Sequence, residues 1–167
     1  MAAGPTYTPI ATSTLGSNTA TVTFSSISGY TDLVMVFNGL VVQNSDAIWL
    51  QFNSDSGTNY SWTRLTGNGT SAASSRSSGT AGTSNWYGGS ANGISNSNNS
   101  TVVLQVFNYA NSTTYKTWIS RTASLGVETS VGLWRNTAAI TSITLGVEGS
   151  RNYASGSTFT LYGIAAA

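Results

Sequence analysis

Short segments in which apolar and polar residues alternate recur along most of the chain. In ATVTF, for example, Ala20, Val22 and Phe24 would lie on one face of an extended strand, and Thr21 and Thr23 on the other. No long stretch repeats with the period near 3.6 that an amphipathic helix requires, and Gly, Ser, Thr and Asn are abundant where helix formers would be needed. The sequence therefore predicts an all-β fold.

Ten segments carry the strand pattern. They are TYTPIATSTL (6–15), ATVTF (20–24), TDLVMVFNGLVV (31–42), AIWLQFN (47–53), YSWTRL (60–65), TVVLQVFNY (101–109), TYKTWISRTA (114–123), ETSVGLWR (128–135), AITSITLGVE (139–148) and STFTLYGI (157–164). Many short strands at such regular intervals are typical of a sandwich or barrel. We expect about ten strands in two packed antiparallel sheets of jelly-roll type, a β-sandwich.

A tract built almost only from Gly, Ser, Thr, Asn and Ala occupies residues 67–100, with Trp86 and Tyr87 near its middle. As a linker it would separate two groups of five strands, and each group would be too small to bury a core. We therefore expect one domain, residues 1–167, with a long Gly/Ser/Asn-rich loop insertion at about 67–100. Trp86 and Tyr87, with little apolar cover nearby, are the candidate binding residues for a protein partner or a glycan.

The amino-acid composition limits the catalytic and metal-binding chemistry that the chain can perform. Histidine and cysteine are absent, which removes the commonest proton-transfer group, the commonest metal ligand and every thiolate site. We expect no cofactor, no metal site and no enzymatic activity, and hence no catalytic residues. The alternative enzyme is a glycan hydrolase that uses Glu128 and Glu148 as its carboxylate pair, but with no motif around them two solvated surface charges are the simpler interpretation.

The segment NSDSGTN, residues 53–59, places Asn53, Asp55 and Asn59 at spacings that resemble part of a calcium loop. The later bidentate Glu of such a loop is missing, so turn formation is the favoured interpretation. Because these residue types readily reverse the chain, we expect the turn to join Phe52 and Tyr60 in a hairpin.

Charge and hydropathy indicate which partners are excluded. Only 7% of residues are charged, six basic against five acidic, so we expect no nucleic-acid partner. The longest apolar run, LVMVF at 33–37, is far below the ~20 residues that span a bilayer, so we expect no membrane insertion. The first residues carry no basic and apolar signal pattern, so we expect the chain to be used as made.

Three segments carry a resemblance to a known family. They are PTYTPIATSTLGSNTATVTFSSISGYTDLVMVF (5–37), NSDSGTNYSWTRLTGNG (53–69), and the C-terminal run from NYANSTTYKTWISRTAS to GSRNYASGSTFTLYGI (108–164). Together they resemble small virion structural proteins of tailed bacteriophages. The resemblance implies a jelly-roll sandwich on a phage particle. It carries no catalytic motif.

The role that this resemblance implies is a capsid decoration, or cement, protein that binds the shell and stabilises it. The expected partners are the major capsid protein and the protein itself as a homotrimer, and the expected location is the virion surface after assembly in the host cytoplasm. The alternative role is a tail-fibre or receptor-binding module that recognises a host-surface carbohydrate through Trp86 and Tyr87.

Overall fold

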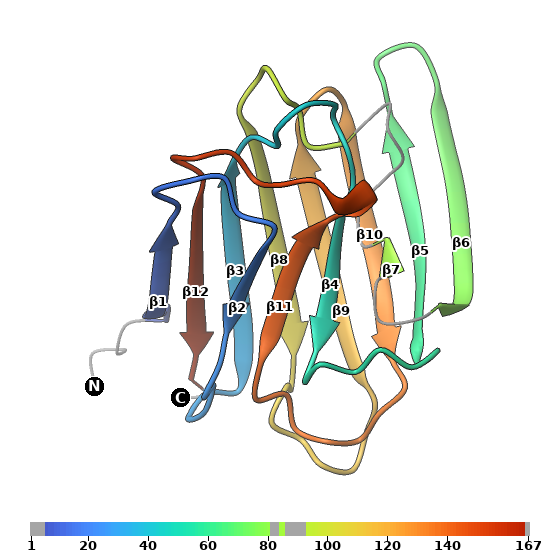
Figure 1. The fold of residues 1–167 in the computed structure, drawn as a ribbon. Coiled ribbons are helices and arrows are strands. Elements are labelled where there is room, and N and C mark those ends of the chain that lie inside the picture. Colours follow the sequence, from blue (N-terminus) through green and yellow to red (C-terminus); the bar gives the residue numbers. More distant parts are fainter. Residues whose placement is uncertain (1–5, 81–83, 86–92, 166–167) are drawn as a thin grey trace.

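The chain folds into two antiparallel sheets packed as a β-sandwich (Figure 1). The computed structural model describes residues 6–80, 84–85 and 93–165, and in these residues it contains twelve strands and one 3-10 helix. The elements are β1 (Thr8–Thr14), β2 (Thr21–Phe24), β3 (Asp32–Gly39), β4 (Ile48–Phe52), β5 (Tyr60–Gly67), β6 (Ala72–Thr80), β7 (Ser84–Asn85), β8 (Ser100–Phe107), β9 (Lys116–Ala123), β10 (Val127–Trp134), β11 (Ile143–Val147), η1 (Glu148–Ser150) and β12 (Thr158–Ile164). Within the described residues, no helix is long and apolar enough to cross a bilayer.

The strand order is that of a jelly roll with two insertions. The large sheet has the order β1-β12-β3-β8-β9-β10-β5-β6, and the small sheet has the order β2-β11-β4-β7. Without β5, β6, β9 and β10, eight strands remain in two four-stranded sheets, and strands from the two ends of the chain interleave in both, as in a jelly roll. The insertions follow β4 and β8, and all four of their strands extend the large sheet on one side (Figure 1).

All ten segments expected to be strands form strands, and the jelly-roll sandwich is confirmed. The two further strands lie inside the Gly/Ser/Asn-rich tract, where a loop was expected. Residues 72–80, AASSRSSGT, form β6, which pairs with β5 along its whole length. This strand has no apolar face, so backbone hydrogen bonding to β5 holds it, and the period-two signal of a buried strand is missing.

The expected hairpin between Phe52 and Tyr60 is wrong. β4 belongs to the small sheet and β5 to the large one, so the intervening turn carries the chain across the sandwich. Asp55 organises this turn by accepting hydrogen bonds from Gly57 N (2.8 Å), Asn59 Nδ2 (2.9 Å) and Trp134 Nε1 (2.7 Å). Burial tends to raise the pKa of Asp55, but these hydrogen bonds outweigh burial and lower it.

The core lies between the two sheets and is rich in aromatic side chains. Phe52 from the small sheet packs against Trp134 of the large sheet, with ring centroids 5.6 Å apart. Trp118 on β9 is buried as well, and its indole crosses the paired Gly132 on β10, where an added Cβ would lie 2.0 Å from the ring. Only glycine allows this close approach of ring to strand.

Candidate functional site

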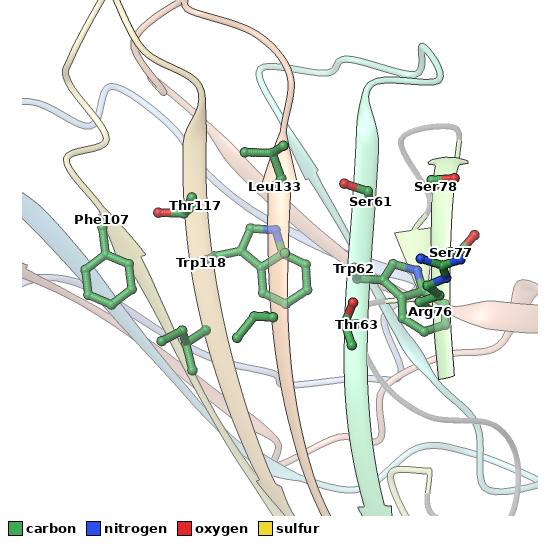
Figure 2. Close-up of a pocket in the computed structure, with 13 residues that line it drawn as sticks. Ser61, Trp62, Thr63, Arg76, Ser77, Ser78, Phe107, Thr117, Trp118 and Leu133 are labelled. Carbon is green, nitrogen blue, oxygen red and sulfur yellow. The ribbon is translucent and has the colours of Figure 1, made fainter. Parts of the chain in front are cut away.

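A shallow groove of about 500 Å³ crosses the outer face of the large sheet, the face turned away from the small sheet (Figure 2). The alternation that buries Trp62, Trp118 and Trp134 turns the residues between them outward. Strand pairing then arranges these outward residues in two adjacent rows. One row is Ile119, Val131, Thr63 and Arg76, and the other is Phe107, Thr117, Leu133, Ser61 and Ser78.

The floor of the groove is apolar and partly open to solvent. Ile119 is 38% exposed and Val131 is 51% exposed, although both are aliphatic residues in the middle of a sheet. Phe107 and Leu133 flank them in the second row and are half-buried. Contiguous exposed apolar surface of this kind marks ligand grooves and interaction sites on folded proteins.

Hydroxyl groups border the apolar floor. Ser61 and Thr63 come from β5, Ser78 from β6 and Thr117 from β9, and all four line the groove (Figure 2). A second hollow of about 270 Å³, formed by Val103, Gln105, Ile119 and Arg121, shares Ile119 with the first. The two hollows therefore form one path across the outer face, from β8 to β6.

Two arginines stand near the ends of this path. Arg76 on β6 and Arg121 on β9 are exposed and make no hydrogen bond or ion pair with any other residue that the structure describes. The other four cationic side chains are engaged within the protein. Arg64 donates to Ser75 and lies over Trp62, Lys116 donates to the carbonyls of Thr114 and Thr137, Arg135 donates to those of Thr58 and Tyr60, and Arg151 pairs with Asp46. The two cationic side chains that bond to no other described residue thus both lie on the outer face of the large sheet.

No carboxylate lines either hollow, and the ionisable side chains among the lining residues are Arg76 and Arg121. The groove therefore combines an apolar floor and hydroxyl rims with unopposed positive charge. Guanidinium groups present N–H donors in a planar fork that matches a carboxylate. An anionic ligand with apolar faces is the chemistry that this arrangement accommodates.

The residues singled out in the sequence lie away from this groove. Trp86 and Tyr87 fall outside the described residues. Glu128 is 5% exposed on the inner face of β10, where it accepts a hydrogen bond from Ser130 Oγ (3.1 Å), so its interpretation as a solvated surface charge is wrong. Glu148 lies in η1. Burial raises the pKa of Glu148, and the Arg64 guanidinium opposes part of that rise.

The polar side chains of residues 53–59 make structural hydrogen bonds, both within the turn and to residues outside it. Asn53 Oδ1 accepts from the backbone N–H groups of Thr141 (2.8 Å) and Ser142 (3.1 Å), and its Nδ2 donates to the carbonyl of Ala139. The Asp55 and Asn59 side chains bond to each other at 2.9 Å. Across the described residues, no group of three or more Asp, Glu, His or Cys side chains could hold a metal ion.

Sequence reasoning missed Arg76 and Arg121 as site residues. Arg121 occupies an outward position of a strand that was expected, but its neighbours across the sheet depend on strand order and register. Arg76 lies in the tract that was expected to be a loop. A charged residue in an otherwise uncharged 34-residue tract, residues 67–100, was the available signal.

No protein-family model and no curated protein sequence matches the chain. Among solved structures it is similar to alginate lyase Aly36B, with a TM-score of 0.40 and 8% identity over 92% of this chain and 77% of that chain. A variant of that enzyme in complex with an alginate trisaccharide gives a TM-score of 0.39 and 6% identity over 92% of this chain and 80% of that chain.

These findings correct two expectations. A non-enzymatic capsid decoration protein was expected, whereas the two solved structures named above are of an enzyme, alginate lyase. The expectation that the chain is not an enzyme falls for the same reason. A TM-score this low assigns no activity to the chain. The resemblance to phage proteins, the virion location and the trimer stay predictions.

Proposed function

We propose that the protein binds a segment of an acidic polysaccharide in the groove on the outer face of the large sheet. The observation that carries this proposal is an apolar, solvent-exposed floor together with Arg76 and Arg121, two arginines that bond to no other residue in the described part of the chain. Pyranose rings have apolar C–H faces and polar edges. Ring faces would lie on Ile119, Val131 and Phe107, while ring carboxylates would pair with the guanidinium groups.

The spacing of the arginines favours a polymer over a single sugar. Arg76 pairs with Thr63, Thr63 with Val131 and Val131 with Ile119, and Arg121 lies two residues beyond Ile119 on β9. Three strand spacings and two residues place the Cα atoms of Arg76 and Arg121 ~16 Å apart. A chain of several acidic sugars spans this distance and can contact both guanidinium groups along the groove.

The test is titration of the purified protein with polygalacturonate, alginate and hyaluronate, with uncharged dextran as the comparison. We expect binding of at least one acidic polymer, no binding of dextran, and affinity that falls as salt rises, because the contacts are charged and exposed. Arg76→Gln and Arg121→Gln should each weaken binding roughly tenfold, as expected for the loss of one charge-assisted contact of ~1.4 kcal/mol.

Arg151→Gln is the matched control because it removes the same charge from a side chain outside the groove, which the structure pairs with Asp46. It should leave the affinity for the acidic polymer within about twofold of wild type. Equal losses in all three variants would show a general charge effect and contradict the proposal. Absence of binding to every acidic polymer, or burial of Ile119 and Val131 in a stable oligomer, would overturn it as well.

A further inference from the structure

Trp49 is the most exposed tryptophan in the described part of the chain. Trp62, Trp118 and Trp134 are between 0% and 8% exposed, whereas Trp49 is half-buried on the outer face of the small sheet. The alternation of β4 buries Ile48, Leu50 and Phe52 and turns Trp49 to that opposite face. The core is therefore complete without the Trp49 indole, which lies against the outside of the sandwich.

The indole of Trp49 lies flat across the neighbouring strand. Gly146 on β11 pairs with Trp49 on one side and with Thr21 on the other, so the three residues form one row across the sheet. A Cβ added at Gly146 would lie 2.2 Å from Cζ2 and 2.3 Å from Cε2 of Trp49. One face of the ring therefore rests on the Gly146 backbone, and the ring extends toward Thr21.

Trp49 lines a hollow of about 500 Å³ on this outer face. Thr21 contributes a hydroxyl to its wall, and Glu148 and Arg151 contribute a carboxylate and a guanidinium. The hollow thus presents a flat aromatic surface next to one acceptor group and one donor group. None of its lining residues belongs to the groove on the large sheet.

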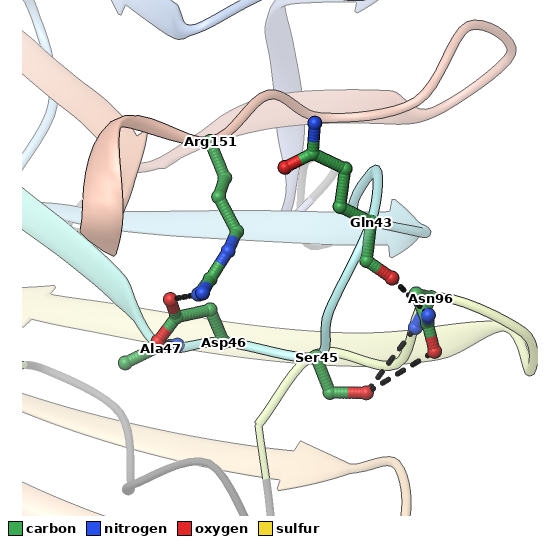
Figure 3. Close-up of polar contacts among 6 residues, drawn as sticks. All are labelled: Gln43, Ser45, Asp46, Ala47, Asn96 and Arg151. Carbon is green, nitrogen blue, oxygen red and sulfur yellow. Dashed lines mark hydrogen bonds and ion pairs between the residues drawn. The ribbon is translucent and has the colours of Figure 1, made fainter.

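Arg151 is held in position by the segment before β4. Its guanidinium pairs with Asp46, and the other carboxylate oxygen of Asp46 accepts the Ala47 N–H at 2.8 Å (Figure 3). Asp46 is itself fixed by two backbone hydrogen bonds to Ile94, of 3.2 and 2.9 Å. A guanidinium has five N–H donors, so the pairing with Asp46 leaves others for a ligand.

We infer that this hollow is a second carbohydrate site, which takes an uncharged pyranose stacked on Trp49. A sugar ring placed on the indole would bury its C–H face against the aromatic surface. Its neighbouring hydroxyls would donate to the Glu148 carboxylate and accept from the Arg151 guanidinium. The Glu148 carboxylate lines the hollow, and Asp46 already pairs with the Arg151 guanidinium, so a neutral sugar fits better than the acidic polymer proposed for the other face.

The test is titration of the full chain with cellohexaose, xylohexaose, mannohexaose and maltohexaose. Binding is monitored through tryptophan fluorescence and through the indole N–H resonances in NMR spectra. We expect at least one hexasaccharide to bind and to shift the Trp49 indole resonance. Trp49→Ala should weaken that binding at least tenfold, and Trp49→Tyr should retain it within a few fold, because a flat ring is kept.

Arg76→Gln is the matched control here and should leave hexasaccharide affinity unchanged, whereas Arg151→Gln should lower it. Conversely, Trp49→Ala should leave the affinity for the acidic polymer unchanged. The experiments therefore test the two proposed sites independently. The inference is overturned if no hexasaccharide binds at millimolar concentration, or if Trp49→Ala binds as wild type does. Should Trp49→Ala fold poorly, an indole resonance of Trp49 that stays unshifted in saturated wild-type protein is equally decisive against it.

Discussion

At the scale of single residues, a cross-strand pair of glycine and tryptophan occurs both in the core and on the surface. Gly132 and Gly146 each lie on a strand beneath an indole from the neighbouring strand, Trp118 in the first case and Trp49 in the second. A strand glycine lacks a side chain to pack, and a cross-strand aromatic ring covers the backbone that glycine leaves bare. Buried, the pair fills the sandwich. On the outside, it presents a flat aromatic surface.

Gly132→Ala should destabilise the protein, because the new Cβ would lie 2.0 Å from the Trp118 ring, which is enclosed in the core and cannot move freely. Overpacking of this kind costs about 1–3 kcal/mol in the free energy of unfolding. Urea unfolding followed by fluorescence measures it. Gly16→Ala is the control, since a Cβ built at Gly16 meets nothing within 4 Å. A Gly132→Ala variant as stable as the control would contradict the packing described for Trp118.

At the scale of elements, the crossover between β4 and β5 depends on one carboxylate. Asp55 accepts from the Trp134 indole and from the Asn59 amide through the same oxygen, and so ties the turn to the core. The turn-forming residue types of this segment were evident in the sequence. The sheet change that it makes was not, because turn chemistry sets the local reversal and says nothing about which strand the chain pairs with next.

Asp55→Asn should lower the free energy of unfolding by about 1–3 kcal/mol near neutral pH, because an amide group cannot accept all the hydrogen bonds that the carboxylate accepts. The pKa of Asp55 is lowered in the folded state, so its ionised form stabilises the fold above the unfolded-state pKa of ~3.9, and this stabilisation is lost as the pH falls below that value.

The measurement is urea unfolding of wild type and variant from about pH 7 to about pH 3. The difference between them should be largest near neutral pH and shrink below about pH 4. Asp32→Asn is the comparison, since Asp32 Oδ1 accepts one backbone N–H, from Asn108, which an amide oxygen can also accept. A difference for Asp55→Asn that does not change with pH would show that its carboxylate is not held in ionised form by the turn.

Strands with a buried face were predictable, and strands or sites that depend on pairing were not. β4 and β10 can be recognised in the sequence because alternate residues enter the core. β6 has no such residues and exists through its backbone ladder with β5, so its composition indicated a loop. Arg76 and Arg121 share one face only through the register of four strands, which a single sequence does not encode locally.

At the scale of the whole molecule, the two proposed sites occupy opposite outer surfaces of one sandwich. The groove with Arg76 and Arg121 lies on the large sheet, and the hollow with Trp49 lies on the small sheet. Because the core separates them, occupation of one site need not obstruct the other. A protein of this form could hold an acidic polymer on one side and a neutral glycan on the other.

The pairing of β1 with β12 makes the protein suitable for circular permutation. Thr8 is directly opposite Gly163, so the start of the first strand lies beside the end of the last. A short flexible linker that joins the end of β12 to the start of β1, together with new ends opened between the exposed Ser112 and Thr113, should therefore give a circular permutant with the same fold. Circular dichroism and urea unfolding would check this, and a permutant that stays unfolded would contradict it. The sandwich then does not depend on which strand of the β1–β12 pair begins the chain. A second protein inserted between the end of β12 and the start of β1 of the permutant should leave both sheets intact.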